Sequence, residues 1–208
     1  MLEHHVEGQS REKNQDRKKV ILLLGGVGAG KSRILNILRQ RFDAKIIQAD
    51  LVAKELEKKG NAGYHKLVAY FGEEILGADG EIDKGKLAEL IFGDEQALMM
   101  VNQMIHPLVW REIVSWIAGF ETGILVVESA IPDKKQDDIY EEVWYVYTQK
   151  EIRTQRLMES RGYSYEKCLS IFENQPREEE YRALADHVID NSGTFEETLR
   201  QIHKLLES

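Results

Sequence analysis

Cysteine and proline are scarce in this sequence, and long apolar runs are missing. Cys168 is the single cysteine among 208 residues, which excludes an internal disulfide and any metal site built from several cysteines. A chain with one cysteine suits a reducing compartment. No apolar run approaches the roughly 20 residues of a membrane-spanning helix, and residues 1–16 lack the apolar segment of a signal peptide. We therefore expect a cytoplasmic protein without a membrane partner.

Positive charge is also in deficit. Lysine and arginine total 28 against 36 aspartates and glutamates, which gives a net charge of −8. Affinity for nucleic acid backbones comes largely from clustered lysine and arginine, so this balance argues against a nucleic-acid partner. The hydrophobic share of 42% is enough for the core of one ordinary domain. We predict a flexible tail over residues 1–17 and a single domain over residues 18–208.

The most informative stretch is KVILLLGGVGAGKS at residues 19–32. It fits the phosphate-loop pattern G-x-x-x-x-G-K-[ST], in which Gly25 and Gly30 are the fixed glycines. Val20–Leu24 is an unbroken aliphatic run, which is typical of a strand buried on both faces of a parallel sheet. Glycines let the backbone curve around a phosphate, and a helix N-terminus adds N–H groups. The stretch predicts a nucleoside triphosphate site; the alternative is a glycine-rich turn between strand and helix.

Three side chains are candidates for the chemistry around this loop. Lys31 would reach the β- and γ-phosphates, and the Ser32 hydroxyl would hold Mg²⁺. Glu128 follows the apolar run 124–127, where an acidic residue would meet the metal; the alternative is a cap for the next turn. The residues expected to bind ATP in and after the loop are Gly26, Gly28, Ala29, Gly30, Lys31, Ser32 and Arg33.

Asp50 is a further candidate because it follows a short strand predicted at Lys45–Gln48. Ligands of open α/β sheets bind outside the carboxyl ends of the strands, so Asp50 and the phosphate loop are expected to face one crevice. The alternative is an N-cap, because aspartate is favoured there and a helical pattern begins at Leu51.

Between residues 61 and 123 the pattern is mostly helical, with a polar interruption at 77–80. Asp83 and Asp94 precede helical runs and are predicted to be N-caps. Pro107 should kink or divide the helix that contains it, because proline lacks the N–H that the helical ladder needs.

The last third of the chain supplies more strands and an arginine-bearing helical stretch over residues 149–185, broken by Gly162 and Pro176. Most of its arginines should be surface residues paired with glutamates, and Arg161 is the best candidate to reach phosphates. Thr194 and Glu197 form a capping box for the final helix. Strands are predicted at 20–24, 45–48, 124–127, 143–147 and 187–189.

These elements predict an α/β fold of the P-loop NTPase type, with a five-stranded parallel sheet and helices on both faces. The chain has no N-K-x-D motif, so a guanine-specific GTPase is disfavoured. A compact chain with an arginine-bearing segment after the fourth strand suits phosphoryl transfer to a small acceptor. We therefore interpret residues 61–123 as a helical acceptor-binding insertion and residues 149–185 as a lid-like segment.

Several longer segments narrow the choice of kinase. They are GGVGAGKS at 25–32, QAD at 48–50, FGEEILGADGEID at 71–83, HPLV at 106–109, QRLMESRG at 155–162, Gln175 and ADHVIDNSG at 185–193. Together they resemble the dephospho-coenzyme A kinases, over residues 20–206. The resemblance implies transfer of the γ-phosphate of ATP, with Mg²⁺, to the ribose 3′-hydroxyl of dephospho-coenzyme A, the last step of coenzyme A synthesis.

The resemblance also implies roles for individual residues. It places Asp50 at the acidic residue near the acceptor hydroxyl and Arg161 at the lid arginine of the family. It places Asn191, in the loop 191–193, near the adenine of ATP.

The sequence departs from the family at three places near the expected acceptor site or loop. Arg33 stands where many members have threonine, Trp110 replaces a frequent arginine, and ESAIPDKKQDD at 128–138 replaces a more apolar run. Two alternatives therefore stay open: a kinase of another small acceptor, such as a nucleoside or nucleotide, and a non-catalytic ATP-binding regulatory protein. In each case we expect a monomer or a weak homo-oligomer.

Overall fold

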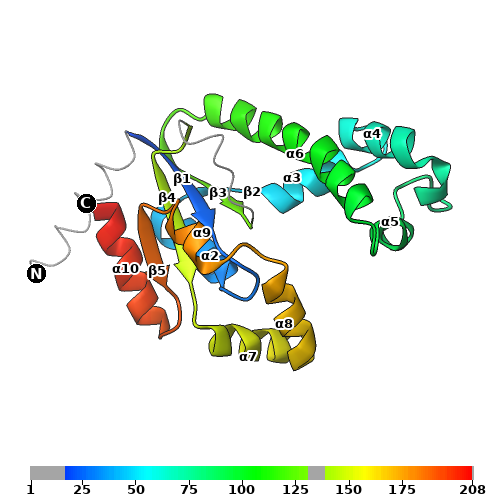
Figure 1. Cartoon of the computed structure of the whole chain (residues 1–208). Coiled ribbons are helices and arrows are strands. Elements are labelled where there is room, and N and C mark those ends of the chain that lie inside the picture. The colour runs from blue at the N-terminus through cyan, green and yellow to red at the C-terminus, as the bar shows by residue number, and fades with distance from the viewer. Residues whose placement is uncertain (1–16, 131–138, 208) are drawn as a thin grey trace, which may run out of the picture. The chain divides into compact units, whose positions relative to one another are not determined.

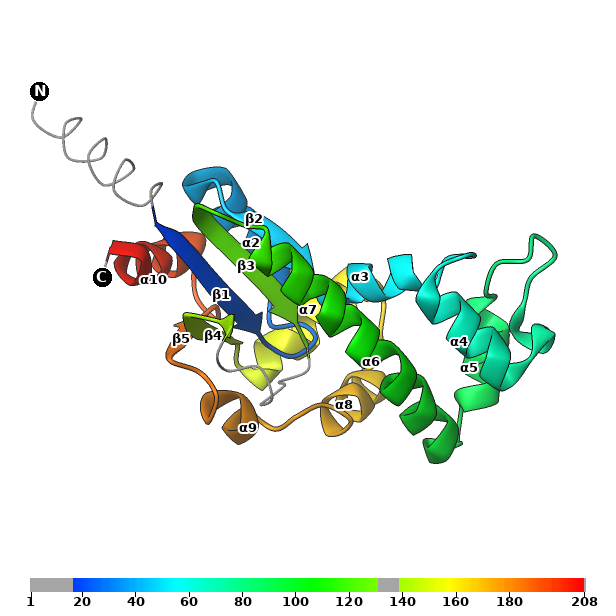
Figure 2. The same ribbon diagram turned by 90° about the horizontal axis from the view of Figure 1, so that it is seen from above.

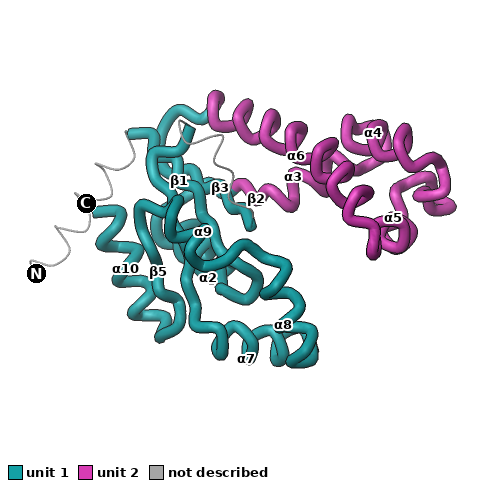
Figure 3. Tube along the Cα trace, in the orientation of Figure 1, with its two compact units in different colours: residues 1–46, 120–208 teal, residues 47–119 magenta. Residues whose placement is uncertain are grey.

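Figure 1 shows a computed structural model of the chain, which describes residues 17–130 and 139–207. The chain forms two compact units (Figure 3). The first consists of Met1–Ile46 with Phe120–Ser208, and the second of Ile47–Gly119. Two segments lie outside the described residues. They are the predicted tail, apart from Arg17, and residues 131–138 of the ESAIPDKKQDD segment.

Five strands form one sheet, in the order β2-β3-β1-β4-β5. β1 pairs in parallel with β3 and with β4, and β4 pairs in parallel with β5. Viewed from above, β1 runs between β3 and β4 (Figure 2). The predicted five-stranded parallel sheet is confirmed. Its strands are β1 (Lys18–Leu24), β2 (Lys45–Gln48), β3 (Gly123–Ser129), β4 (Glu142–Tyr147) and β5 (His187–Asp190).

Helices α2 (Lys31–Phe42) and α10 (Phe195–Glu207) cover one face of the sheet. Alternate strand residues such as Ile21 and Trp144 point into this core, where Ile202 of α10 joins them, and all three are fully buried. The capping box at the start of α10 is present, because Thr194 N donates to Glu197 Oε2 at 2.8 Å and Glu197 N donates to Thr194 Oγ1 at 3.2 Å. The predicted cap is therefore confirmed.

A smaller helix packs on the opposite face. Tyr145 alternates with Trp144 along β4, so its ring points away from the first core. Tyr181 of α9 (Glu178–Arg182) stacks on that ring, with centroids 5.0 Å apart and planes at 4°. Between β4 and α9 lie α7 (Lys150–Arg161) and α8 (Tyr165–Glu173), so the predicted breaks near Gly162 and Pro176 are confirmed.

The second unit is helical. Its longest helix, α6, contacts α3, α4 and α5, and buries Ile105, Leu108 and Ile113. No helix in the described part of the chain is long and apolar enough to cross a membrane. The elements are α3 (Ala49–Leu56), α4 (Ala62–Phe71), the 3₁₀ turn η1 (Glu73–Ile75), α5 (Lys84–Ile91) and α6 (Glu95–Ala118).

Both predicted N-caps of this unit are confirmed. The Asp83 carboxylate accepts hydrogen bonds from the first turn of α5, and the Asp94 carboxylate accepts one from Ala97 N at 2.9 Å. Of the two outcomes predicted for Pro107, a kink or a division, the division is wrong, because α6 runs through Pro107 without interruption. Proline removes one hydrogen bond of the ladder, but Ile105 and Val109 are buried on either side and hold both halves by packing.

Candidate active site

The ends of three adjacent strands create the edge from which the site is built. In the parallel register, Leu24 at the end of β1 lies opposite Ser129 of β3 and Tyr145 of β4. The loop that begins at Gly25 therefore leaves the sheet next to Glu128, as the strand-end argument predicted.

The loop curves through left-handed glycines into α2. Gly28 and Gly30 have φ values of 81° and 85°, a region in which a side chain is strained. Gly30 is also crowded, because a β-carbon there would fall on the side-chain amide of Asn191. Glycine is thus required at position 30 by the backbone and by its neighbour.

Lys31 and Glu128 form an ion pair beside the loop. Lys31 Nζ donates to Gly25 O at 2.6 Å and lies 3.2 Å from Glu128 Oε1. Their side chains are only 13% and 10% exposed, so each charge is placed where unpaired burial would be costly. The ammonium group is held at the mouth of the loop, where a phosphate would need it.

Ser32 and Arg33 occupy the first turn of α2. Ser32 is exposed, so its hydroxyl is accessible from solvent. Arg33 Nη1 donates to Asn191 Oδ1 at 3.2 Å, and its guanidinium lies 5.4 Å from the ring centroid of Phe195. Of this pair, the structure ties Arg33 to Asn191 and leaves Ser32 open.

Asn191 is a buried hub beside the loop. It follows β5 and is 0% exposed. Its Nδ2 donates to Ala29 O at 2.9 Å, and its Oδ1 accepts from Thr198 Oγ1 at 3.2 Å as well as from Arg33. Thr148 Oγ1 also donates to Ala29 O, at 2.9 Å. The resemblance placed Asn191 near adenine; the structure adds that its amide supports the loop itself.

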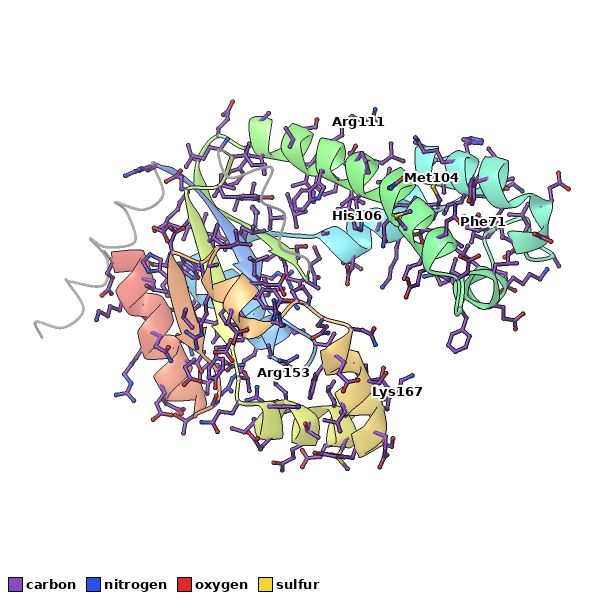
Figure 4. All side chains as sticks on the ribbon, in the orientation of Figure 1. Phe71, Met104, His106, Arg111, Arg153 and Lys167 are labelled. Atoms are coloured by element: carbon purple, nitrogen blue, oxygen red, sulfur yellow. The ribbon has the colours of Figure 1, made fainter. Side chains whose placement is uncertain are left out.

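The sequence argument missed two arginines of α7. Arg153, which Figure 4 labels, donates from Nε to the loop oxygen Val27 O at 3.0 Å. Arg156 Nη2 donates to Asn191 O at 2.8 Å. Burial lowers the pKa of both guanidinium groups, and the nearby charge of Arg33 contributes at Arg156. Their i, i+3 spacing beside the buried Leu157 was the signal that would have placed them on the inner face of the helix.

Arg161, the predicted lid arginine, lies at the C-terminal end of α7. It is the last residue of α7, it is exposed, and its guanidinium lies 5.9 Å from the ring centroid of Tyr163. Gly162 ends the helix in the left-handed conformation at φ 65°. The α7 arginines with hydrogen bonds to the loop and to Asn191 are Arg153 and Arg156.

Asp50 belongs to the helical unit, where it is the second residue of α3 and is exposed. The N-cap of α3 is Gln48, so the alternative that Asp50 is an N-cap is wrong. An acidic residue in the first turn still complements the helix dipole. His106 and Trp110 lie half-buried on α6 of the same unit, and Figure 4 labels His106 there.

The oxygen donors at the loop fit Mg²⁺. Mg²⁺ prefers oxygen ligands and is usually held by one or two protein groups together with substrate phosphates and water. The exposed hydroxyl of Ser32 and the carboxylate of Glu128, at the end of β3, are donors of this kind.

Comparison with known proteins gives one consistent family. The model of the dephospho-CoA kinase family matches residues 19–197. A dephospho-CoA kinase of Carboxydothermus hydrogenoformans is 37% identical over 192 residues, which cover 90% of this chain and 93% of that protein. The fold is similar to a crystal structure from Thermus thermophilus (TM-score 0.76, 27% identity, 91% and 96% coverage) and to a dephospho-CoA kinase from Campylobacter jejuni (TM-score 0.68, 22% identity, 92% and 96% coverage).

Proposed function

This chain belongs to the dephospho-CoA kinase family, and from that premise we propose that it transfers the γ-phosphate of ATP to the ribose 3′-hydroxyl of dephospho-CoA. The observation that carries the proposal is the extent of the match. Residues 19–197 include the phosphate loop, the whole helical unit and the α7–α8 segment, so the likeness is not that of the loop alone. The product would be coenzyme A, at the last step of its biosynthesis.

We propose that ATP binds with its phosphates on the loop. The support is the ammonium of Lys31 at the loop mouth and the N-terminus of α2, which both favour an anion. In phosphoryl transfer the protein contributes mainly position and charge, because the transition state is loose. The residues assigned to ATP are Gly26, Gly28, Ala29, Gly30, Lys31, Ser32, Arg33 and Asn191.

Mg²⁺ would be held by Ser32 and Glu128, and when bound it neutralises charge on the phosphates of ATP. Lys31 is already paired with Glu128 at 3.2 Å, so a phosphate would share the ammonium with that carboxylate. This pair and the hydrogen bond to Gly25 O hold the ammonium group of Lys31 at the loop.

In the reaction, the oxygen of the acceptor hydroxyl forms a bond to the γ-phosphorus while the bond to the β,γ-bridging oxygen breaks, and ADP leaves. We assign Asp50 to orient that hydroxyl and accept its proton, because it is an exposed carboxylate one residue past the junction of β2 and α3. We assign Arg161 to offset charge on the transferred group, following the family resemblance. Lys31, Asp50 and Arg161 are the proposed catalytic residues.

The decisive experiment is an ADP-release assay over a panel of acceptors: dephospho-CoA, several nucleosides, several nucleotides and no acceptor. We expect release that depends on dephospho-CoA and on Mg²⁺. Release with a nucleoside or nucleotide alone would instead identify a kinase of that acceptor. Binding of Mg·ATP without acceptor-dependent release would identify a non-catalytic nucleotide-binding protein.

We further propose that the protein acts in the cytoplasm as a monomer or weak homo-oligomer. The buried Cys168 and the substrates of the reaction support the compartment. Sedimentation of the purified chain over a tenfold range of concentration tests the oligomeric state.

A further inference from the structure

We infer that Arg153 and Gln175 form a brace that positions the tip of the phosphate loop for ATP. We call this pair the Arg153–Gln175 brace. The inference rests on the proposed use of ATP but not on the identity of the acceptor. It assigns these two side chains as positioning residues, because they act on the loop rather than on the reacting atoms.

The brace forms hydrogen bonds with both the backbone N–H and the backbone C=O of Val27, a residue of the phosphate loop. Val27 N donates to Gln175 Oε1 at 3.2 Å, and Val27 O accepts from Arg153 Nε at 3.0 Å. Arg153 Nη2 then donates to the same Gln175 Oε1 at 2.9 Å and closes the arrangement. The position of Val27 is therefore fixed from two sides by side chains that lie more than 120 residues away in the sequence.

Two helices hold the brace in place. Arg153 is on α7, and its guanidinium lies 4.4 Å from the ring centroid of Phe172 on α8. Gln175 comes directly after α8. A planar guanidinium that stacks with one face and hydrogen bonds with its edges is fixed in orientation, a geometry that lysine does not reproduce.

Gly26 has no side chain, and this leaves the space that the side chains of the brace occupy. A β-carbon at this residue would lie 2.6 Å from Arg153 Nη2 and 2.6 Å from Gln175 Oε1, too close for either atom to stay. Gly26 is not among the glycines with positive φ, so its backbone does not itself require glycine. The requirement at this position comes from the two braced side chains, in contrast to Gly30.

The expected consequence is tighter binding of Mg·ATP. A loop that already holds its bound shape loses less conformational entropy when the phosphates arrive. Without the brace, the backbone around Val27 would have to become ordered on binding, and this loss of entropy would weaken the affinity for Mg·ATP. We expect Gln175→Leu and Arg153→Met each to raise the Kd of Mg·ATP about tenfold, the equivalent of one charge-assisted hydrogen bond.

The first test measures Mg·ATP binding by calorimetry, with no acceptor present, on the whole chain. Because the two side chains act as one unit, the double variant should bind no more than about twofold worse than either single variant. Arg153→Lys, which keeps the charge but cannot bridge Val27 and Gln175, should also weaken binding about tenfold. Gln155→Leu is the matched control, since the Gln155 side chain donates to the exposed Glu159 on the same helix at 2.8 Å.

The second test uses Gly26→Ala. In the wild-type background it should raise the Kd of Mg·ATP about tenfold, because the methyl group displaces the brace. In an Arg153→Ala, Gln175→Ala background the space is open, and the same change should raise the Kd by a smaller factor than it does in the wild type. A role in fold stability alone would lower the melting temperature without this dependence on background.

The outcomes separate the two proposals. If the wild-type chain does not bind Mg·ATP, the proposed function fails. The brace is overturned if the wild type binds Mg·ATP and both Arg153→Lys and folded Gln175→Leu bind it as tightly as the wild type does. The brace is also overturned if Gly26→Ala raises the Kd by the same factor in both backgrounds. If no ADP is released with dephospho-CoA but the Kd values change as stated, the brace stands and the acceptor is wrong. Should Gln175→Leu fail to fold, Arg153→Lys and the Gly26 pair decide the question.

Discussion

The surroundings of the phosphate loop and the helical unit are built in opposite ways. Around the loop, polar side chains are buried and hydrogen-bonded; Asn191 and Thr198 are both 0% exposed. In the helical unit, Asp50 is exposed, Phe92 is 90% exposed, and α5 has no buried residue. The difference indicates that the loop is held in place by buried, hydrogen-bonded side chains, while the helical unit offers accessible side chains.

The largest effect is expected from a substitution in the helical unit, at the exposed Asp50. Asp50→Asn should lower turnover about 10²–10⁴-fold, the range of general-base assistance, while the Kd of Mg·ATP changes by less than about twofold. The reason is that Asp50 is assigned to the acceptor and not to the loop. Steady-state turnover and calorimetry measure the two quantities separately.

The matched control for Asp50 is Glu55→Gln, because Glu55 is another exposed acid of α3 and forms an ion pair with Lys58 at the surface. It should leave turnover unchanged. If Asp50→Asn keeps turnover within about threefold of wild type, Asp50 has no part in the chemistry.

The corresponding substitution at the phosphate loop is Lys31→Met. It removes the cation at the loop mouth, so we expect kcat/KM to fall about 10²–10³-fold, as for loss of one preorganised donor. Unlike Asp50→Asn, it should also weaken Mg·ATP binding. Lys19→Met is its control, because Lys19 lies on β1, away from the loop, and pairs with Glu142 at 2.7 Å. Equal losses in the two lysine variants would contradict the assignment.

A smaller effect tests whether the two units also differ in stability. Ile113 and Ile202 are both 0% exposed, one in each unit. Ile→Val at either position should lower the free energy of unfolding by about 0.5–1.5 kcal/mol. Trp116 reports on the helical unit and Trp144 on the first, so single-tryptophan versions followed in urea separate the transitions. If the units unfold independently, each change moves only the transition of its own unit.

A dependence on pH, with no effect at neutral pH, is predicted at the α9 contact. Burial raises the pKa of Tyr181 to about 12, above the ordinary value of about 10. The folded state therefore holds this proton more tightly than the unfolded state. Below pH 10 the contribution is constant, and between pH 10 and 12 the free energy of unfolding falls as pH rises.

Tyr181→Phe removes this titration, so its stability should fall less steeply with pH above 10 than that of the wild type. Urea unfolding at intervals from pH 8 to 11 measures the slope for both proteins. The variant also loses the hydrogen bond from Tyr181 to Ala130 O, which lowers stability at every pH and does not change the slope. Parallel slopes would rule out the raised pKa.

Local patterns predicted much of this molecule. The aliphatic run before Gly25 gave β1, and single residues such as Asp83 and Asp94 marked helix starts because capping depends on neighbours three residues away. The placement of Lys31 next to Glu128 followed from the rule that parallel strands end at one edge.

What the sequence could not show depends on contacts between distant segments. Gln175 was noticed only through family resemblance, and its bond to Val27 N spans 148 positions. α3 belongs with the helical unit because it contacts α6, which no pattern around residues 49–56 reveals. Local rules predict a kink or a division at Pro107, but α6 continues through this residue, and buried residues on both sides hold the two halves.

The strand order has a consequence for synthesis on the ribosome. β1 is translated early, but its partners β3 and β4 begin roughly 100 and 120 residues later, at Gly123 and Glu142. At about 5–20 residues per second, the central strand waits several seconds or longer for a neighbour. The helical unit, by contrast, is one continuous stretch that is complete at Gly119. A nascent chain of this protein therefore holds its most apolar strand unpaired until after the helical unit has been translated, which makes β1 the segment that most needs protection by a chaperone.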